Sequence, residues 1–195
     1  MALTSAAAAL AQAVPTLLAQ GEWTRRVEAT SADLLHDTYN GLLAFVVPGR
    51  DDYSQHQGVA TDEPGGVESG AVDALIATID ESTPYVPGFS VQIAGILNYI
   101  ALAINGAAEG PFSSPFARLS MAEKAGVFKV MDADPSLKVI ASVLPAFVAF
   151  FVYSEAGVFD PATRSLTGEP LGWTLSNYQG VADGRNEFLG YLGGK

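Results

Sequence analysis

Apolar residues recur along much of the chain at intervals of three and four, the spacing that is typical of amphipathic helices. The clearest case begins at a capping residue, Thr30 or Ser31, and runs to about Val47. Pro48 and Gly49 end this segment, because proline disrupts a helix and glycine has a low helix propensity. This segment is predicted to be a helix with one apolar stripe, formed by Leu34, Leu35, Leu42, Leu43 and Val46.

Four later stretches favour helices for related reasons. Residues 71–80 carry one apolar face, while residues 91–104 are apolar nearly all round, which is typical of a central helix. Ser120 and Glu123 have the spacing of a capping box at the start of a helix. Asp134 and Pro135 have the pattern of a helix cap followed by proline at the first helical position. This pattern predicts the start of the helix that carries Leu144, Phe147, Phe150 and Phe151.

The first residues are rich in alanine and leucine, which favours a helix over residues 2–19 that Pro15 ends or kinks. A secretory signal needs a positive segment before the apolar one, and the first basic residue here is Arg25. Arg25 and Arg26 follow the apolar stretch, which is the wrong order for a twin-arginine signal. We therefore expect a helix here rather than an export signal.

Between and after these helices the chain is polar or irregular. Residues 50–70, from Arg50 to Gly70, form a long acidic loop, and residues 106–115 form a linker rich in glycine, proline and serine. We predict an all-α fold, a compact bundle of about five or six helices with a long irregular C-terminal tail. The single domain, 1–195, comprises an N-terminal Ala-rich helix and linker (1–28), a helical core (29–155) and the tail (156–195).

Composition narrows the classes of function. Hydrophobic residues make up 49% of the chain and charged residues 16%, a balance that predicts a folded core rather than disorder. The net charge is −11, and the 10 Lys and Arg residues provide little material for a nucleic-acid site. The chain has no cysteine, which excludes disulfides, thiolate metal sites and cysteine nucleophiles within it.

The strongest candidate for a membrane span is the apolar run from Val139 to Tyr153. It has about 15 residues, whereas a span needs about 20. Lys138 and Glu155 flank the run, and Pro145 interrupts it. We therefore predict a buried core helix, no direct membrane span and a soluble acidic chain.

Candidate chemistry is sparse. His36 and Asp37 lie in a predicted helix and His56 lies in the acidic loop, so they are weak candidates for a metal site whose spacing matches no standard motif. Paired acids in the loop are typical of a solvated surface, since catalytic pairs must converge in space. No nucleophile elbow, phosphate-binding loop or dinucleotide fingerprint is present. We expect no catalytic residue and no cofactor in this chain.

The tail is rich in aromatic residues, which either pack on the core or anchor a partner. We expect Trp173 to belong to the core. Tyr178, Asn186 and Tyr191 lie further along the tail and are the predicted partner-binding residues.

Five segments together resemble the small (gamma) subunit of gluconate 2-dehydrogenase and of related membrane or periplasmic sugar dehydrogenases. A helix ending in Pro-Gly-Arg-Asp is followed by a loop and helix that begin Pro-Gly-Gly-Val-Glu. Two later segments resemble the closing helices of that family, and a Gly-Trp pair with a later aromatic residue resembles its tail. These segments are residues 42–51, 64–73, 116–120, 150–155 and 172–180.

The resemblance implies a non-catalytic accessory subunit that stabilises or assembles a flavin-dependent sugar or alcohol dehydrogenase or oxidase. FAD is then expected on the large flavoprotein subunit of the glucose-methanol-choline type, and not on this chain. We expect a cytoplasmic location, with the periplasm as the alternative if a partner co-exports the chain. Two other functions stay open: a stand-alone enzyme that uses the Arg50–Gly70 loop, and a helical protein that binds a small molecule.

Overall fold

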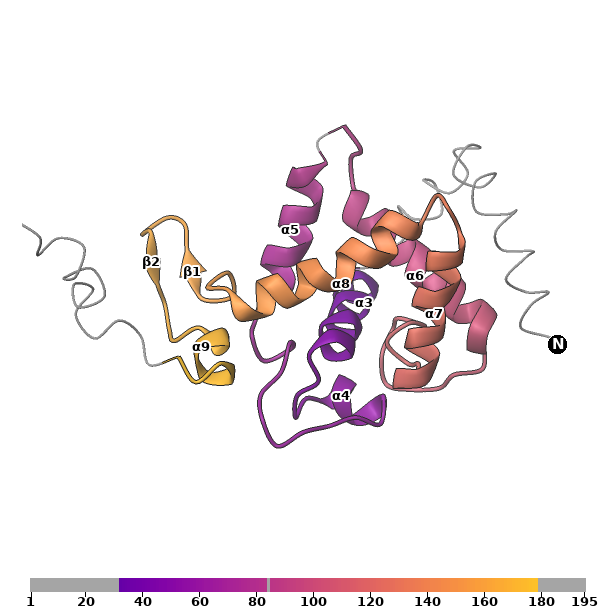
Figure 1. Ribbon diagram of the computed structural model, residues 1–195, viewed down its shortest axis with the longest axis horizontal. Coiled ribbons are helices and arrows are strands. Elements are labelled where there is room, and N and C mark those ends of the chain that lie inside the picture. The colour runs from indigo at the N-terminus through magenta and orange to yellow at the C-terminus, as the bar shows by residue number, and fades with distance from the viewer. Residues whose placement is uncertain (1–31, 84, 179–195) are drawn as a thin grey trace, which may run out of the picture.

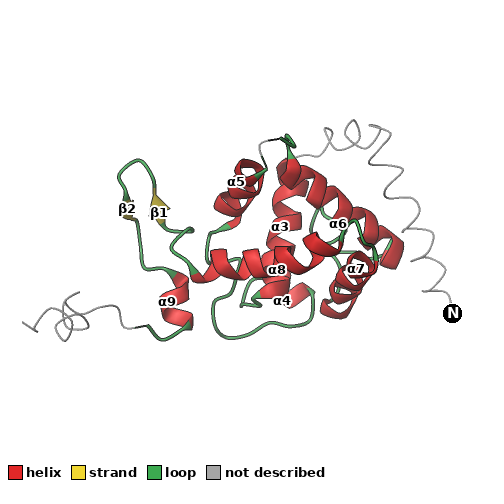
Figure 2. Cartoon of the chain, turned by 45° about the horizontal axis from the view of Figure 1, so that its top comes forward, coloured by secondary structure: helices red, strands yellow, loops and turns green. Residues whose placement is uncertain are grey.

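The computed structural model describes residues 32–83 and 85–178, and in this part of the chain the fold is all-α, as predicted. Five longer helices pack into a compact body around a core of buried aliphatic and aromatic side chains (Figures 1 and 2). They are α3 (Ala32–Val46), α5 (Val72–Ser82), α6 (Phe89–Asn105), α7 (Met121–Ala133) and α8 (Lys138–Tyr153). The helix expected over residues 2–19 lies outside the described residues.

Helix α3 lies in the middle of the body, where it contacts α4, α5, α6 and α8. Its apolar stripe is fully buried at Leu42 and Leu43, which confirms the stripe predicted from the sequence. Helix α6 packs against α3, α5 and α7, and most of its apolar residues are buried. Leu102 is an exception, because 52% of its surface is exposed, so α6 is apolar on a face that meets solvent.

Two helix starts differ from the prediction. Asp134 ends α7 and caps the turn that leads into α8: its backbone is extended, its carboxylate accepts hydrogen bonds from the Ser136 amide and hydroxyl, and its carbonyl accepts one from the Lys138 amide at 2.9 Å. The regular helix α8 begins after this turn, at Lys138, three residues beyond the predicted first helical residue, Pro135. Helix α6 begins early, at Phe89, because Asp80 of α5 accepts hydrogen bonds from the Ser90 amide and hydroxyl at the helix start.

Two short helices and a hairpin lie where the sequence predicts only loops. Helix α4 (Asp52–His56) forms one turn within the acidic loop. The tail contains an antiparallel hairpin of β1 (Phe159–Asp160) and β2 (Ser165–Leu166), followed by helix α9 (Leu171–Leu175). The rest of residues 156–178 is irregular, as predicted for the tail. Figure 1 shows this part as an arm that extends from the end of α8, away from the helical body.

Candidate functional site

The acidic loop has a fixed shape set by hydrogen bonds, although its residues 58–63 are exposed. Two backbone hydrogen bonds hold the later part of the loop against the segment where it begins. The Thr61 amide donates to the Gly49 carbonyl at 2.9 Å, and the Gly66 amide donates to the Val47 carbonyl at 2.8 Å. A Cβ atom on Gly65 would lie 2.6 Å from Gly49 Cα, closer than real side chains come. The two glycine-containing segments that carry the family resemblance, 42–51 and 64–73, therefore meet along their backbones.

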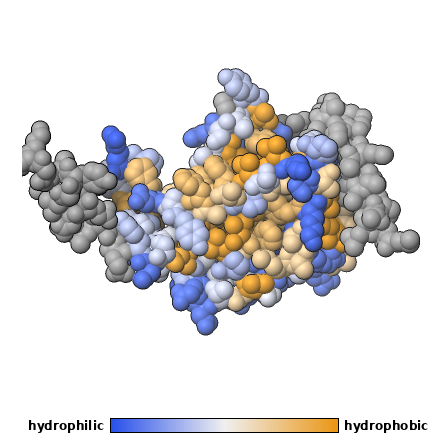
Figure 3. Space-filling model, in the orientation of Figure 1, coloured by the Kyte–Doolittle hydropathy of each residue, from blue (hydrophilic) through white to orange (hydrophobic). Residues whose placement is uncertain are grey.

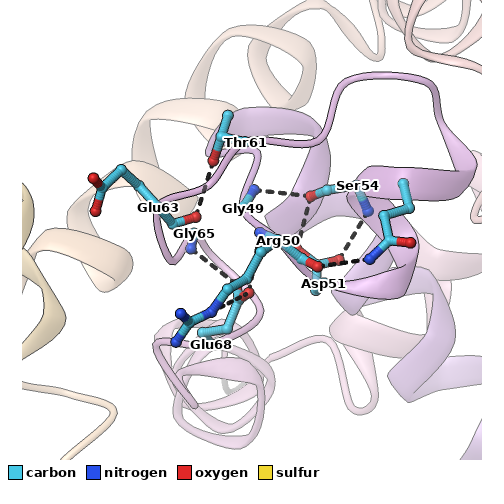
Figure 4. A network of polar contacts seen from close by, with 9 residues as sticks. Gly49, Arg50, Asp51, Ser54, Thr61, Glu63, Gly65 and Glu68 are labelled. Atoms are coloured by element: carbon cyan, nitrogen blue, oxygen red, sulfur yellow. Dashed lines mark hydrogen bonds and ion pairs between the residues drawn. The ribbon is translucent and has the colours of Figure 1, made fainter.

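The acidic side chains of this loop hold its backbone in place (Figure 4). Asp51 caps α4 by accepting hydrogen bonds from the amide and the hydroxyl of Ser54 at 2.8 and 2.7 Å. Glu68 accepts hydrogen bonds from the amides of Arg50 and Gly65 at 3.1 and 2.9 Å. These carboxylates bind neighbouring backbone groups, so their geometry is that of capping residues rather than of a converging acid–base pair.

Lys124 anchors the loop to the helical body, although its side chain is completely buried. Its ammonium group donates hydrogen bonds to Gln57 Oε1 at 2.8 Å and to the Gly41 carbonyl at 3.2 Å, and lies 5.6 Å from the centre of the Phe116 ring. Burial lowers the pKa of Lys124 to about 7. The sequence contained a signal for this position, because Lys124 shares a helix face with the buried Val127 and Met131.

The three weak metal candidates point in different directions. His36 pairs with Asp73 on α5 at 3.0 Å, at an exposed position. Asp37 accepts hydrogen bonds from the Tyr53 hydroxyl, at 2.6 Å, and from the Ser113 amide. The ring of His56 lies 2.9 Å from the Arg118 carbonyl oxygen. Among residues 32–83 and 85–178, no three His, Cys, Asp or Glu side chains are grouped so that they could hold a metal ion.

Tyr53 connects the loop to the linker that the sequence places at 106–115. Its ring stacks on Phe112 with ring centres 4.0 Å apart. The pKa of Tyr53 is raised above its ordinary value. Burial is the main cause, and the hydrogen bond to Asp37 and the negative charge of that carboxylate add to it. The linker is thus a fixed part of the body.

A second buried polar cluster, missed by the sequence analysis, holds the linker from the inside. Asn98 of α6 donates to Thr38 Oγ1 at 2.8 Å, while its carbonyl accepts from the Ser114 hydroxyl at 2.7 Å and from the Phe116 amide at 3.0 Å. Because every partner is paired, the cluster fixes one arrangement of α3, α6 and the linker at little cost in desolvation. The visible signal was one asparagine within the otherwise apolar run from Ile93 to Ile104.

The arm, residues 154–178, contains Tyr178, the one predicted partner-binding residue that lies within the described part of the chain. Phe159 and Leu166 pair across the hairpin and are 46% and 38% exposed, and Tyr178 is 45% exposed. Trp173 is half-buried and meets the Tyr178 ring edge-on, with ring centres 5.5 Å apart. The expectation that Trp173 belongs to the core is wrong, because Leu171 and Leu175 of α9 make the contact with the core instead. Asn186 and Tyr191 lie outside the described residues.

Helix α8 is buried on one side only, which corrects the prediction of a buried core helix. Its outer side exposes an apolar stripe, which we call the α8 stripe: Val139, Val143, Ala146, Phe150 and Tyr153. Figure 3 shows apolar side chains gathered in the middle of this face of the molecule. None of the helices in the part of the chain that the structure describes combines the length and apolarity needed to cross a membrane.

A groove of about 290 Å³ runs beside the first half of α8. Val139, Val143 and Phe147 form one wall, and Ile79 of α5 with Phe89 and Ile93 of α6 form the other. Its lining is almost entirely apolar, and Ser82 and Thr83 line its α5 end. A concave, apolar lining of this kind suits an apolar small molecule.

Comparisons of the chain with models of known protein families, with curated proteins and with solved structures found no match.

Proposed function

We propose that this chain is a non-catalytic accessory subunit that binds and stabilises a larger protein through its arm. The proposed partner is the large subunit of a flavin-dependent sugar or alcohol dehydrogenase or oxidase, which would hold the FAD. The identity of the partner rests on the resemblance of five segments to a family of small subunits. The exposed aromatic and apolar residues of the arm are the observation that carries the docking role.

The shape of the arm suits this role. It extends from the end of α8, and its hairpin exposes Phe159 and Leu166 side by side. Aromatic residues such as Phe159 and Tyr178 are enriched at the centres of protein interfaces. Because α9 packs against the body, a partner would bind the exposed hairpin and the outer side of the arm and bury these residues there. The Arg50–Gly70 loop supports the non-catalytic part of the proposal. Asp51 and Glu68 accept hydrogen bonds from backbone amides of the loop, so both carboxylates have structural roles there.

The experiment is affinity purification of the tagged full chain from its native host, with identification of bound proteins by mass spectrometry. We expect a flavoprotein that brings a flavin absorbance spectrum into the complex. The double variant Phe159→Ser/Leu166→Ser should weaken binding by about 2 kcal/mol or more. Leu102→Ser, which changes an exposed leucine on α6, is the matched control and should bind normally.

Two results would contradict the proposal. If the arm variants and Leu102→Ser bind the partner equally well, then the arm is not the docking element. If the tagged chain brings down no flavoprotein, or turns over a substrate by itself, then the accessory role is wrong.

A further inference from the structure

The α8 stripe is complementary to itself when two copies of α8 run in opposite directions. Its five residues are spaced four, three, four and three apart, so they fall within a strip about 80° wide at 3.6 residues per turn. Ala146 lies at the centre of the strip, with two residues on either side. We propose that this stripe is the interface of a symmetric homodimer, with the twofold axis passing next to Ala146.

The sizes of the side chains support this pairing. In an antiparallel pair centred on Ala146, Val139 of one copy faces Tyr153 of the other, and Val143 faces Phe150. Small side chains at the centre allow two helices to approach closely, while the valines leave room for the aromatic rings opposite them. Phe150 and Tyr153 are 65% and 50% exposed in the single chain, so each has surface to bury.

The groove gives the aromatic residues a place to bind. Val139 and Val143 belong both to the α8 stripe and to one wall of the groove. The twofold axis would therefore bring Phe150 of the second copy to the mouth of the groove in the first. Helix α8 thus has exposed aromatic rings near its C-terminal end and the groove beside its N-terminal half. In a twofold dimer the same surface of both copies must fit itself, and this arrangement meets that condition.

Charge gives a third, independent reason. No charged residue occurs between Lys138 and Glu155, so the contact face of α8 holds no charge that the interface would have to desolvate. Both end residues are exposed. Their midpoint lies next to Ala146, so antiparallel pairing places Lys138 of each copy beside Glu155 of the other, at the rim of the interface. A parallel pairing would place like charges together instead.

The test is the mass of the purified full chain by light scattering and sedimentation over a wide range of concentration. We expect twice the chain mass of 20.3 kDa. Ala146→Glu should give a monomer, because it places two like charges at the twofold axis. Ala122→Glu, at an exposed position on α7, is the matched control and should leave the dimer intact. Circular dichroism of both variants checks that the helices are retained.

Two further variants test the direction of the helices. Lys138→Glu alone should weaken the dimer about ten-fold by creating two like-charge contacts, and adding Glu155→Lys should restore it. Because the chain has no cysteine, Ala146→Cys provides a single thiol. A short bismaleimide should link two copies of Ala146→Cys but not of Val139→Cys, whose thiols would lie at opposite ends of the interface.

A monomer at every concentration would overturn the proposal, whether or not a small molecule is retained in the groove. So would a monomer that dimerises only after deletion of residues 1–31, since the α8 stripe would then bind that segment of the same chain. Equal crosslinking of the two cysteine variants would rule out the antiparallel arrangement. None of these outcomes bears on the arm, whose binding to a flavoprotein is measured separately.

Discussion

The ammonium group of Lys124 donates a hydrogen bond to the side-chain oxygen of Gln57, at 2.8 Å, in the interior of the protein. This contact joins α7 to the loop that follows α4, and a second hydrogen bond from Lys124 to the Gly41 carbonyl joins α7 to α3. No carboxylate bonds to the buried ammonium group in the described part of the chain. The protein therefore buries a titratable lysine amine among neutral hydrogen-bond partners, which makes its stability depend on pH.

Lys124 should make the folded protein more stable as the pH rises from 7 towards 9.5. Burial lowers the folded-state pKa to about 7, below the unfolded value of 10.5, so the unfolded chain binds more protons in this range. The free energy of unfolding should then increase by up to about 1.4 kcal/mol per pH unit. Urea denaturation at several pH values measures this slope.

The variant Lys124→Met should lose most of that slope, because it removes the titrating group. Lys129→Met, on the exposed side of the same helix, is the control and should keep the slope of the unchanged protein. If Lys124→Met and the unchanged protein show parallel dependence on pH, then Lys124 is not the group responsible.

Gly65→Ala should destabilise the protein by about 1–3 kcal/mol, because the new methyl group has no room. The new methyl group would meet the backbone nitrogen of Gly49 and would lie 2.6 Å from Gly49 Cα and from the Pro48 carbonyl carbon, and backbone cannot move aside as a flexible side chain can. Gly126→Ala in α7 is the control, since its methyl group would meet only Ile104 Cδ1 at 3.4 Å. The control should be neutral or up to about 1 kcal/mol more stable, because alanine favours helix. Equal effects in chemical denaturation would show that the two ends of the loop are not in close contact.

Asn98→Leu should cost at least about 2 kcal/mol of stability, because it leaves several buried groups without partners. The Ser114 hydroxyl and the Phe116 amide both donate to the Asn98 carbonyl, and neither is exposed to water that could replace it. Leu102→Asn changes an exposed position on the same helix and should shift the free energy of unfolding by about 0.5 kcal/mol or less. A neutral Asn98→Leu would mean that the polar cluster does not hold the linker.

The long helices were predictable from the sequence, because each repeats its apolar residues often enough to define a face. Helices α4 and α9 have five residues each and are too short to show a period, so their positions depend on contacts that the sequence does not display. The cap at Asp134 was visible in the sequence, but the turn that it caps, residues 134–138, separates α7 from the regular part of α8. The local pattern of a cap does not decide how close to the cap the regular helix begins.

The candidate surfaces were harder to predict than the helices. Helix α8 is apolar nearly all round, so its sequence does not distinguish the side that meets α3 and α7 from the side left exposed. The positions of Val139 and Phe150 on the outer side follow from the packing of the whole body. Lys124 and Asn98 were visible as polar residues on apolar faces, but their partners come from residues between 16 and 83 positions away in the chain.

Trp173→Ala tests whether the arm is an extension of the core or a separate binding element. Trp173 is half-buried and its described ring contact is with Tyr178, so the isolated chain should lose only about 0.5–1.5 kcal/mol. For a chain of this length, that loss lowers the melting temperature by no more than about 6 °C. Phe116→Ala is the comparison within the core, because Phe116 is fully buried and its truncation should cost about 3–5 kcal/mol.

The two variants should behave in opposite ways when the partner is present. Trp173 and Tyr178 support each other's rings, so removing the tryptophan should weaken binding of the proposed flavoprotein by about 2 kcal/mol or more. Phe116→Ala, where it remains folded, should bind normally, because Phe116 lies inside the body and not on the arm. The melting temperature of each isolated variant and its affinity for the purified large subunit are the required measurements. A large loss of stability in Trp173→Ala with unchanged affinity would place the tryptophan in the core after all, and would remove it from the binding surface.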